Sequence, residues 1–492
     1  MKRKYYLTTP LYYVNDIPHI GHAYTTIAAD VLARYKKMMG FDVYFLTGTD
    51  EHGHKIWLAA EDKKETTQKF VDKMAEGFKT AWRTLDIAYD DFLRTTENRH
   101  EQVVQAVFSK LMEQGDIYKG EYEGWYCVPC ESFWSEMDFI DGKNCPDCGR
   151  ATEILKEETY FFKLAKYQDK LLKHFEANPD FLQPLSRKNE ILQFIKRGLK
   201  DLSVTRTAFP WGVGVPGDSK HVVYVWFDAL LNYISALGYP DDEKFKQYWP
   251  ADVQLMGKEI VRFHAVIWPA ILMALNIPLP KKIFGHGWWT VEGKKMSKSR
   301  GNVVDPLVLS DGFGVDPIRY FLLREVPFGS DGDFSMASFI KRYNSDLAND
   351  IGNLLNRTLT MIDLYFQSEI QNSICDTQFD ALSIALVGLT KETPKVVDQH
   401  MNNLAFAAAL AAIWKLINKA NKYIEDETPW KMAKAGETVK LQAVMSNLYD
   451  VLQTTALLVS PFMPATAESM RLQLGVKGKI NKGQPLFPRL QK

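Results

Sequence analysis

The sequence predicts an α/β protein in which a parallel sheet is interrupted by an inserted segment and followed by an all-helical region. Strand-like and helix-like stretches alternate over residues 1–115, which is the pattern of a parallel sheet with crossover helices. Strand signals return at residues 221–227 and 282–287, after a charged, mixed segment at 116–220 that has the character of an insertion. Beyond residue 340 the apolar positions follow helical spacing almost throughout.

The first strand and the first helix are the best defined elements of the parallel-sheet region. Residues 5–10 are rich in aromatic and β-branched side chains and predict a strand. A loop-like segment at 11–18 follows, and apolar residues at helical spacing predict a helix from 23 to 39. A second buried strand is expected at 41–48, followed by a loop at 49–53.

Two histidines stand at the predicted entrance of this first helix, in the segment Pro18-His19-Ile20-Gly21-His22. A helix N-terminus offers free N–H groups and a partial positive charge, which suit phosphate. Because Gly21 has no Cβ, a nucleotide could lie directly against the backbone there. The alternative interpretation is that His19 and His22 are ordinary histidines that cap a helix.

A second polar segment, Lys295-Met296-Ser297-Lys298-Ser299, lies between Gly293 and Gly301. Flanking glycines permit a loop that closes over pyrophosphate. Lys298 would then neutralise charge that builds on the leaving phosphates, while His19 and His22 would act at the α-phosphate of ATP. The alternative is a solvated basic loop, which is the usual fate of a run of charges.

Four of the five cysteines form one pattern, with two Cys-x-x-Cys pairs separated by fourteen residues. Two such pairs supply four thiolates for a tetrahedral zinc ion, and a site closed by four protein ligands is structural. The alternatives are four free thiols or two disulfides, and disulfides are rare in cytosolic proteins. The predicted zinc ligands are Cys127, Cys130, Cys145 and Cys148.

The composition of the 492 residues is that of an ordinary soluble protein, with zero formal net charge. Nucleic-acid binders are often basic, so the balance argues mildly against that role but leaves room for a local patch. The longest apolar stretch, at 265–275, contains Pro269 and is too short to span a membrane. We expect a cytoplasmic protein, because the amino terminus runs directly into the first strand. The basic residues after position 470 form either a basic patch or a solvated terminus. They are Arg471, Lys477, Lys479, Lys482, Arg489 and Lys492.

The order of the two polar segments resembles the signature pair of class I aminoacyl-tRNA synthetases. Further motifs resemble the methionyl-tRNA synthetase family, at residues 8–15, 47–53, 225–229 and 285–287. The resemblance covers essentially the whole chain. It implies that ATP, accompanied by Mg²⁺, activates L-methionine to methionyl-adenylate, and that the methionyl group passes to the 3'-terminal adenosine of tRNA-Met.

The resemblance also implies roles for individual residues. The catalytic and ATP-binding set would be His19, Gly21, His22, Lys295 and Lys298. Asp50 would hold the substrate ammonium, and aromatic and aliphatic walls would suit a polarisable thioether. On sequence grounds alone, each wall residue would be assigned to the core. The implied side-chain pocket is Leu11, Trp226, Ala229, Leu230, Tyr233 and His286.

Asn349, Asn353 and Arg357 recur every four residues and share one face of a predicted helix, opposite an apolar face. Amides and a guanidinium along one helix face can hydrogen-bond to the edges of unstacked bases. The alternative is an ordinary polar helix face, which has the same spacing. Trp430 follows Thr428-Pro429, a plausible N-cap and first helical position, and would either stack on a base or join the core. The resemblance assigns these four residues to reading the CAU anticodon.

The resemblance divides the chain into five segments. Residues 1–115 and 221–293 would form the two halves of a Rossmann-like nucleotide-binding catalytic domain. Residues 116–220 would form a connective insertion with a zinc knuckle at 127–148. Residues 294–340 would contain the lysine-containing loop and a stem-contact region, and residues 341–492 a helical anticodon-binding domain. We expect a monomer, since the chain ends soon after the helical region.

Two other functions stay open. The first is a class I synthetase for another amino acid. The chain has no room for the editing domain that isoleucine, leucine and valine enzymes need, and the four thiols in one insert argue against a cysteine enzyme. The second is a non-catalytic tRNA-binding relative, which we would expect to lack the two histidines or Lys298.

Overall fold

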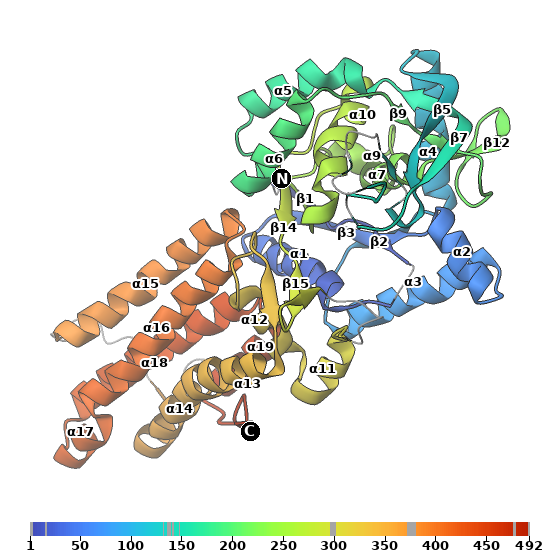
Figure 1. Ribbon diagram of the computed structural model, residues 1–492. Helices are drawn as coiled ribbons and strands as arrows, with labels where there is room; N and C mark the ends of the chain where they lie inside the picture. Colours follow the sequence, from blue (N-terminus) through green and yellow to red (C-terminus); the bar gives the residue numbers. More distant parts are fainter. Residues whose placement is uncertain are drawn as a thin grey trace. The chain divides into compact units, whose positions relative to one another are not determined.

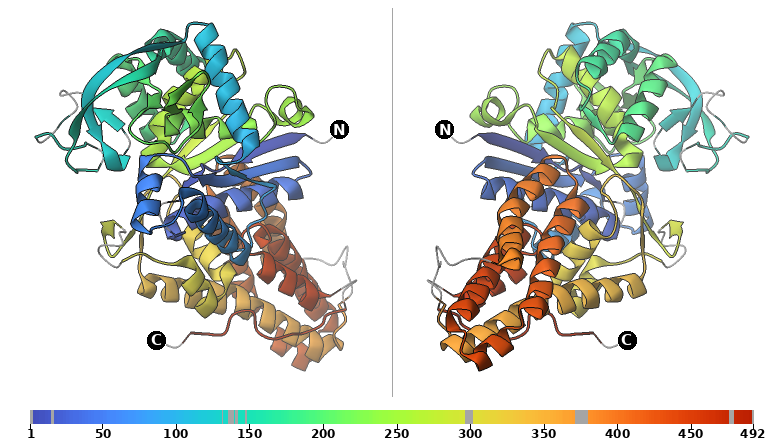
Figure 2. Two further views of the ribbon diagram at one scale, coloured as in Figure 1. Left: turned by 90° about the vertical axis from the view of Figure 1, so that its right-hand side faces the viewer. Right: turned by 90° about the vertical axis from the view of Figure 1, so that its left-hand side faces the viewer.

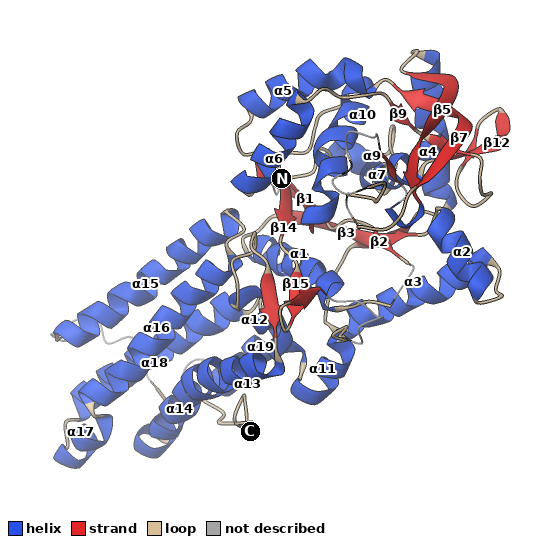
Figure 3. Ribbon diagram, in the orientation of Figure 1, coloured by secondary structure: helices blue, strands red, loops and turns tan. Residues whose placement is uncertain are grey.

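The computed structural model describes residues 3–14, 17–130, 132–134, 139, 142–146, 148–295, 302–370, 380–475 and 479–490. These residues form two compact units, Met1–Gly287 and Trp288–Lys492. Figure 3 shows that the first unit mixes strands with helices, whereas the second is mainly helical. No helix in the described ranges combines the length and the apolar character needed to cross a membrane.

A parallel sheet organises the first unit. Its strands follow the order β2-β3-β1-β13-β14-β8, with β4 paired to β3, and all of these pairs are parallel. Runs such as residues 43–46 are buried throughout, as expected for a sheet covered on both faces. The strands are β1 (Lys4–Thr8), β2 (Tyr12–Tyr13), β3 (Asp42–Asp50), β4 (Asp91–Arg94), β8 (Leu182–Gln183), β13 (Val253–Gly257) and β14 (Ile283–His286).

Helices connect these strands (Figure 1). Helix α1 begins at Ile20 and leads from the first strands to β3, close to the predicted helix. The long helices α3 and α4 are amphipathic, with apolar residues at helical spacing buried and charged residues outside. The helices of this part are α1 (Ile20–Met38), α2 (His54–Asp62), α3 (Thr67–Thr84), α4 (Asn98–Glu113), α9 (Glu243–Tyr248) and α10 (Trp268–Ala274).

The inserted segment forms two small antiparallel sheets. Figure 2 shows its teal strands to one side of the blue strands of the parallel sheet. One sheet has the order β6-β5-β7-β9 and the other β10-β12-β11. Their elements are β5 (Ile117–Cys127), η1 (Val128–Cys130), β6 (Ser132–Trp134), β7 (Glu153–Phe162), η3 (Leu164–Tyr167), α5 (Gln168–Ala177), α6 (Leu185–Lys196), β9 (Leu202–Ser203), β10 (Thr205–Arg206), β11 (Gly214–Val215) and β12 (Asp218–Val223).

The strand expected at 221–227 is wrong in both extent and place. Strand β12 ends at Val223 and pairs antiparallel in the small sheet, and helix α7 (Val225–Leu230) follows at once. Helical spacing lets Phe227, Leu230 and Leu231 bury on one side, which outweighs the strand preference of the valines. The sheet position beside β1 is taken instead by β13.

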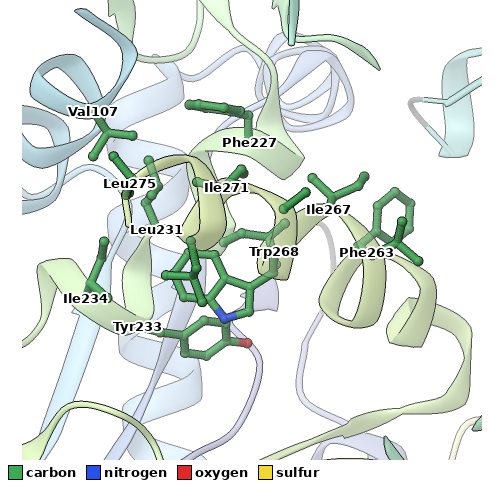
Figure 4. Packing of buried hydrophobic residues seen from close by; sticks show 14 of the residues in the cluster. Val107, Phe227, Leu231, Tyr233, Ile234, Phe263, Ile267, Trp268, Ile271 and Leu275 are labelled. Atoms are coloured by element: carbon green, nitrogen blue, oxygen red, sulfur yellow. The ribbon is translucent and has the colours of Figure 1, made fainter. Parts of the chain in front are cut away.

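The core of the first unit gathers around the segment that follows β13. This segment contains η4 (Lys258–Ile260) and a π-helical turn, η5 (Phe263–Ile267), which continues into α10. The indole of Trp268 is fully buried, and its ring centroid lies 5.7 Å from that of Tyr233 in α8 (Asn232–Ser235). Figure 4 shows these two rings side by side among aliphatic side chains.

The second unit contains a small three-stranded sheet and a helical region. Its long helices α15, α16 and α18 pack against one another (Figure 1), which agrees with the helical pattern expected beyond residue 340. The elements are β15 (Trp289–Val291), β16 (Lys294–Lys295), α11 (Pro306–Phe313), α12 (Val315–Arg324), β17 (Gly332–Phe334), α13 (Met336–Arg342), the π-helical η7 (Tyr343–Gly352), α14 (Asn353–Phe366), α15 (Ala381–Asn402), α16 (Phe406–Glu427), α17 (Pro429–Ala435), α18 (Thr438–Val459) and α19 (Pro464–Leu474).

Candidate functional site

The carboxyl edge of the parallel sheet brings several of the predicted site residues into one region. Strand β1 pairs with β3 on one side and with β13 on the other. The place where the strand order reverses direction is the topological switch point, and open α/β sheets bind ligands there, at the carboxyl ends of the strands. Leu11 follows β1, His19 is the N-cap of α1, Asp50 ends β3 and His286 ends β14.

His19 and His22 cap helix α1 through one nitrogen each. The backbone N–H of Gly21 donates to His19 Nδ1 at 3.1 Å, and the N–H of His19 donates to His22 Nδ1 at 3.3 Å. The two rings stack with centroids 3.9 Å apart. Burial, with a smaller contribution from the neighbouring His19, holds the pKa of His22 well below its usual value. His22 is therefore neutral, and its proton is on Nε2 because Nδ1 is an acceptor.

The helix-capping and the phosphate-binding interpretations of the histidine pair are compatible in this geometry. The capping interaction uses Nδ1 of His22, so the Nε2–H remains as a hydrogen-bond donor at a helix N-terminus. Gly21 is the second residue of the helix and is partly exposed. The other catalytic candidates, Lys298 and the side chain of Lys295, lie outside the described residues; Lys295 is the last residue of β16.

Asp50 lies at the end of β3 in a buried position. Glycine is required two residues earlier, since a Cβ at Gly48 would lie 1.9 Å from the carbonyl oxygen of Leu93 and 2.8 Å from Leu11 Cδ2. Gly48 thus lets β4 approach β3 and leaves room for Leu11. The strand reaches two residues further than predicted, because Thr49 and Asp50 pair with Tyr12 and Tyr13 of β2.

Aromatic side chains from α7, α8 and η5 come together beside the core. The ring of Trp226 stacks on Phe263 with centroids 3.8 Å apart and planes within 3°. The Tyr233 hydroxyl lies 2.7 Å from His264 Nε2, and the His264 ring lies 6.4 Å from that of Trp226. Ala229, Leu230 and Tyr233 are buried, so three of the predicted pocket residues also belong to the packed interior.

Phe263 and His264 were not among the residues predicted from the sequence. The Nδ1 of His264 lies 3.0 Å from the carbonyl oxygen of Ile260, so Nδ1 carries the proton and Nε2 accepts from Tyr233. Burial lowers the pKa of His264 to about 4, which keeps the ring neutral. The available signal was an aromatic residue and a histidine directly before the apolar run at 265–275, which was considered only as a membrane span.

His286 lies beside helix α1. Its Nδ1 donates to the carbonyl oxygen of Gly287 at 2.8 Å, so Nε2 accepts from the Thr25 hydroxyl at 2.6 Å. Its ring meets the edge of Tyr24 at 5.1 Å between centroids. These contacts associate His286 with the helix that carries the histidine pair, while His264 is the histidine bonded to Tyr233.

Three of the predicted zinc ligands come together in the inserted segment. The sulfur atoms of Cys127, Cys145 and Cys148 lie within 4.8 Å of one another. The Cys127 and Cys148 sulfurs are 3.5 Å apart, far longer than the ~2.0 Å of a disulfide, so no disulfide joins these two residues. Thiolates bound to one tetrahedral zinc lie about 3.8 Å apart, from Zn–S bonds of about 2.3 Å. The cluster could therefore hold zinc; the side chain of Cys130 lies outside the described residues.

The predicted base-reading residues occupy a polar face of the second unit. Asn349 in η7 and Asn353 at the start of α14 are exposed, and Arg357 is partly exposed with its guanidinium 2.7 Å from Glu425. The opposite face is buried, as the spacing predicts; it consists of Leu347, Ile351, Leu354 and Leu355.

Trp430 is the second residue of α17 and is half-buried. Pro429 occupies the first helical position, as predicted, but Thr428 does not cap the helix through its side chain. Thr428 is also the C-cap of α16 and has a φ of 48°. This left-handed residue turns the chain between two helices, and its hydroxyl accepts no bond from the first turn of α17. The predicted N-cap interaction is therefore wrong.

Two families match the sequence in succession. Residues 5–154 and 144–359 match the family described as class I tRNA synthetases (M). Residues 385–488 match the anticodon-binding domain of tRNA ligases. The methionine–tRNA ligase of Caldanaerobacter subterraneus subsp. tengcongensis is 55% identical over 510 residues, covering 100% of this chain and 79% of that protein.

The chain belongs to the class I methionyl-tRNA synthetases. The methionine–tRNA ligase of Bacillus subtilis is 50% identical over 99% of this chain and 78% of its own length. Among solved structures, methionyl-tRNA synthetase from Mycobacterium tuberculosis in complex with methionyl-adenylate superimposes with a TM-score of 0.95 at 40% identity, covering 99% of this chain and 100% of that chain. The fold is thus that of a methionyl-tRNA synthetase: a parallel sheet, an insertion with a cysteine cluster, and a helical anticodon-binding domain.

Proposed function

We propose that this chain carries out the methionine–tRNA ligase reaction of its family. The carboxylate of L-methionine attacks the α-phosphate of ATP, giving methionyl-adenylate and pyrophosphate, and the adenylate then acylates the 3'-terminal adenosine of tRNA-Met. The observation that carries this proposal is the 55% identity to a methionine–tRNA ligase over the whole of the chain.

The nucleotide end of the proposed site is built around the start of α1. The neutral His22 would donate its Nε2–H to the α-phosphate, with His19 beside it and the backbone of Gly21 in contact with the nucleotide. ATP would enter with Mg²⁺, and Lys295 and Lys298 would neutralise the departing pyrophosphate. The chemistry needs no side-chain nucleophile, since positioning and charge stabilisation suffice.

The amino-acid end would combine one carboxylate with neutral walls. Asp50 would bind the substrate ammonium. The stacked Trp226 and Phe263 would face the thioether, because sulfur packs favourably against aromatic rings. The bond from Tyr233 to the neutral His264 satisfies both polar groups, so no unpaired charge faces an apolar ligand. Further contributions are proposed from Leu11, Ala229, Leu230 and, beside α1, His286.

ATP–pyrophosphate exchange without tRNA, measured across all twenty amino acids, tests this proposal. We expect exchange with methionine alone. Exchange with another amino acid would keep the fold and refute the proposed pocket. Absence of exchange with any amino acid, both without and with tRNA, would identify a non-catalytic tRNA-binding relative.

We also propose that the cysteine cluster holds one structural zinc ion, with Cys130 as the fourth ligand. Cys127 and Cys145 are buried with Trp134, and Trp125 and Phe139 pack against them. This small apolar cluster offers little core of its own, which is the situation in which a metal stabilises a module. The zinc would stabilise the insertion and take no part in the chemistry.

Replacing Cys127 by serine is expected to lower the zinc content from one ion per chain to below about 0.2, because three remaining ligands bind zinc far more weakly. Metal analysis of the purified protein measures this change. Cys375→Ser, at the fifth cysteine, is the matched control and should keep one zinc ion. Full zinc content in Cys127→Ser would refute the assignment of Cys127.

The polar face of η7 and α14 is proposed to read the anticodon, with Trp430 stacking on a base. Two amides and a guanidinium can bond the edges of unstacked bases, and an indole offers a stacking surface. Arg357 pairs with Glu425 in the absence of tRNA, so binding RNA would exchange one anionic partner for another.

Arg357→Ala is expected to raise KM for tRNA-Met in aminoacylation by about 10- to 100-fold, the effect of losing one good base contact. The measurement compares aminoacylation with tRNA-independent exchange, which should remain. Glu425→Ala is the matched control, since it breaks the same ion pair and leaves the guanidinium in place. Equal losses in both variants would assign Arg357 to stability rather than to RNA.

A further inference from the structure

A buried carboxylate lies between two histidines next to the proposed methionine site. In α7, Asp228 bonds His52 Nδ1 at 2.6 Å and His100 Nε2 at 2.8 Å. The side chains of Asp228 and His100 are 0% exposed and that of His52 is 3% exposed. We call these three residues the His52–Asp228–His100 group. Neither the reaction described above nor the sequence motifs give it a role.

The proton positions in this group follow from its bonds. A carboxylate only accepts, so each histidine donates an N–H to Asp228. The other nitrogen of His100 lies 2.7 Å from the Ser235 hydroxyl, whose oxygen is also 3.3 Å from the carbonyl oxygen of Asn232. The other nitrogen of His52 lies 3.9 Å from Glu101. Both oxygens of the buried Asp228 carboxylate are therefore satisfied, one by each histidine, and a satisfied buried network holds its neighbours rigidly.

The group joins two segments that the proposed function assigns to opposite ends of the amino acid. His52 comes two residues after Asp50, the proposed ammonium ligand. Asp228 comes two residues after Trp226 and directly before Ala229 and Leu230, the proposed side-chain walls. A single carboxylate thus connects two segments 176 residues apart in the chain.

The other side of the Asp50 loop is also held. Arg94 donates to both carboxylate oxygens of Glu51, at 2.7 and 2.9 Å, and the indole N–H of Trp211 donates to the Glu51 carbonyl at 2.6 Å. These contacts fix the loop against β4 and the insertion. The bond from His52 to Asp228 is a direct side-chain link from this loop to helix α7.

We propose that the His52–Asp228–His100 group is a positioning group that sets the distance between Asp50 and helix α7, and thereby selects amino acids by side-chain length. The inference rests on the proposed function, in which Asp50 and Trp226 bind the two ends of methionine. An apolar pocket alone discriminates one methylene by about 10- to 200-fold. That discrimination requires the ammonium ligand to be held at a constant distance from the pocket, since a displacement of about 1 Å costs on the order of 100-fold.

Asp228→Ala tests the proposal in methionine-dependent ATP–pyrophosphate exchange. We expect KM for methionine to rise at least about 10-fold, with kcat and KM for ATP changing less than about threefold. The preference for methionine over ethionine, which is one methylene longer, should fall at least about 10-fold. A purely structural role would lower Tm and the active fraction but leave KM and this preference as in the wild type.

Asp228→Asn is the conservative variant that should restore both values to near wild type. Its amide oxygen can accept from His100, and its amide N–H can donate to His52 Nδ1 once the His52 proton moves to Nε2, which faces Glu101. Asp316→Ala is the matched control. Asp316 is a buried carboxylate in α12 of the second unit that accepts two 2.6 Å bonds from Thr466, so its loss should lower Tm without changing KM for methionine.

If Asp228→Ala does not fold, the variants His100→Gln and His100→Asn are tested in its place. A glutamine amide reaches the position of Nε2 and an asparagine amide does not, so only the asparagine variant should raise KM and relax the preference. Wild-type KM and preference in Asp228→Ala, or in His100→Asn, would overturn the positioning role alone. Absence of methionine-dependent exchange in the unmodified protein, measured first, would overturn the proposed function and this inference with it.

Discussion

Replacing His22 by asparagine is expected to slow methionyl-adenylate formation by about 100- to 1,000-fold, the usual effect of removing one donor aimed at developing negative charge. The asparagine side-chain oxygen can take the place of Nδ1 and accept the His19 N–H, so helix α1 stays capped. The variant has no group in the place of Nε2–H. The rate is measured by methionine-dependent ATP–pyrophosphate exchange, and Tm reports the cap.

Two further substitutions separate capping from catalysis at this position. His22→Gln can place an amide N–H near the Nε2 position and should retain more activity than asparagine. His22→Ala loses both functions, and should lose about 1 kcal/mol of stability in addition to the rate. Wild-type exchange in His22→Asn would mean that His22 is a helix cap alone.

Replacing Lys298 by alanine is expected to slow adenylate formation by on the order of 100- to 1,000-fold while leaving methionine binding largely intact. The reason is that the ammonium would meet charge on the leaving pyrophosphate, which develops as the reaction proceeds and is absent from bound methionine. Exchange kinetics measure the rate, and calorimetric titration with methionine measures the binding.

The matched control for Lys298 is Lys294→Ala. Lys294 is an exposed lysine in β16, just before the pentapeptide, so its removal changes the local charge by the same amount. We expect wild-type exchange in this variant. Equal losses in both variants would mean that the basic character of the loop matters rather than one ammonium, and unchanged rates in Lys298→Ala would refute its role.

The elements that the sequence predicted well depend on neighbours in the chain. The strand before the histidine pair and the helix after it follow from local composition and spacing, and the structure has them as β1 and α1. The cysteine cluster was predictable for the same reason, because ligand spacing within each pair is local. The family resemblance supplied the roles that spacing alone left open.

The elements that the sequence predicted poorly depend on distant packing. Residues 225–227 have the composition of a strand, but burying Phe227 and bonding Asp228 to two histidines favours a helix there. His264 was not predicted because its bond to Tyr233 joins residues 31 apart in the chain. A single sequence does not carry the register between such segments, so neither contact was predictable.

Strand β8 has a consequence for shortening the protein. It comes from within the inserted segment, yet its two residues pair with β14 at the edge of the parallel sheet. Deleting 116–220 and rejoining the ends would therefore remove the strand that pairs with β14. This would leave β14 as an unpaired edge strand, which promotes aggregation. A minimal catalytic fragment needs to retain Leu182 and Gln183, even if the segment with the cysteine cluster is removed.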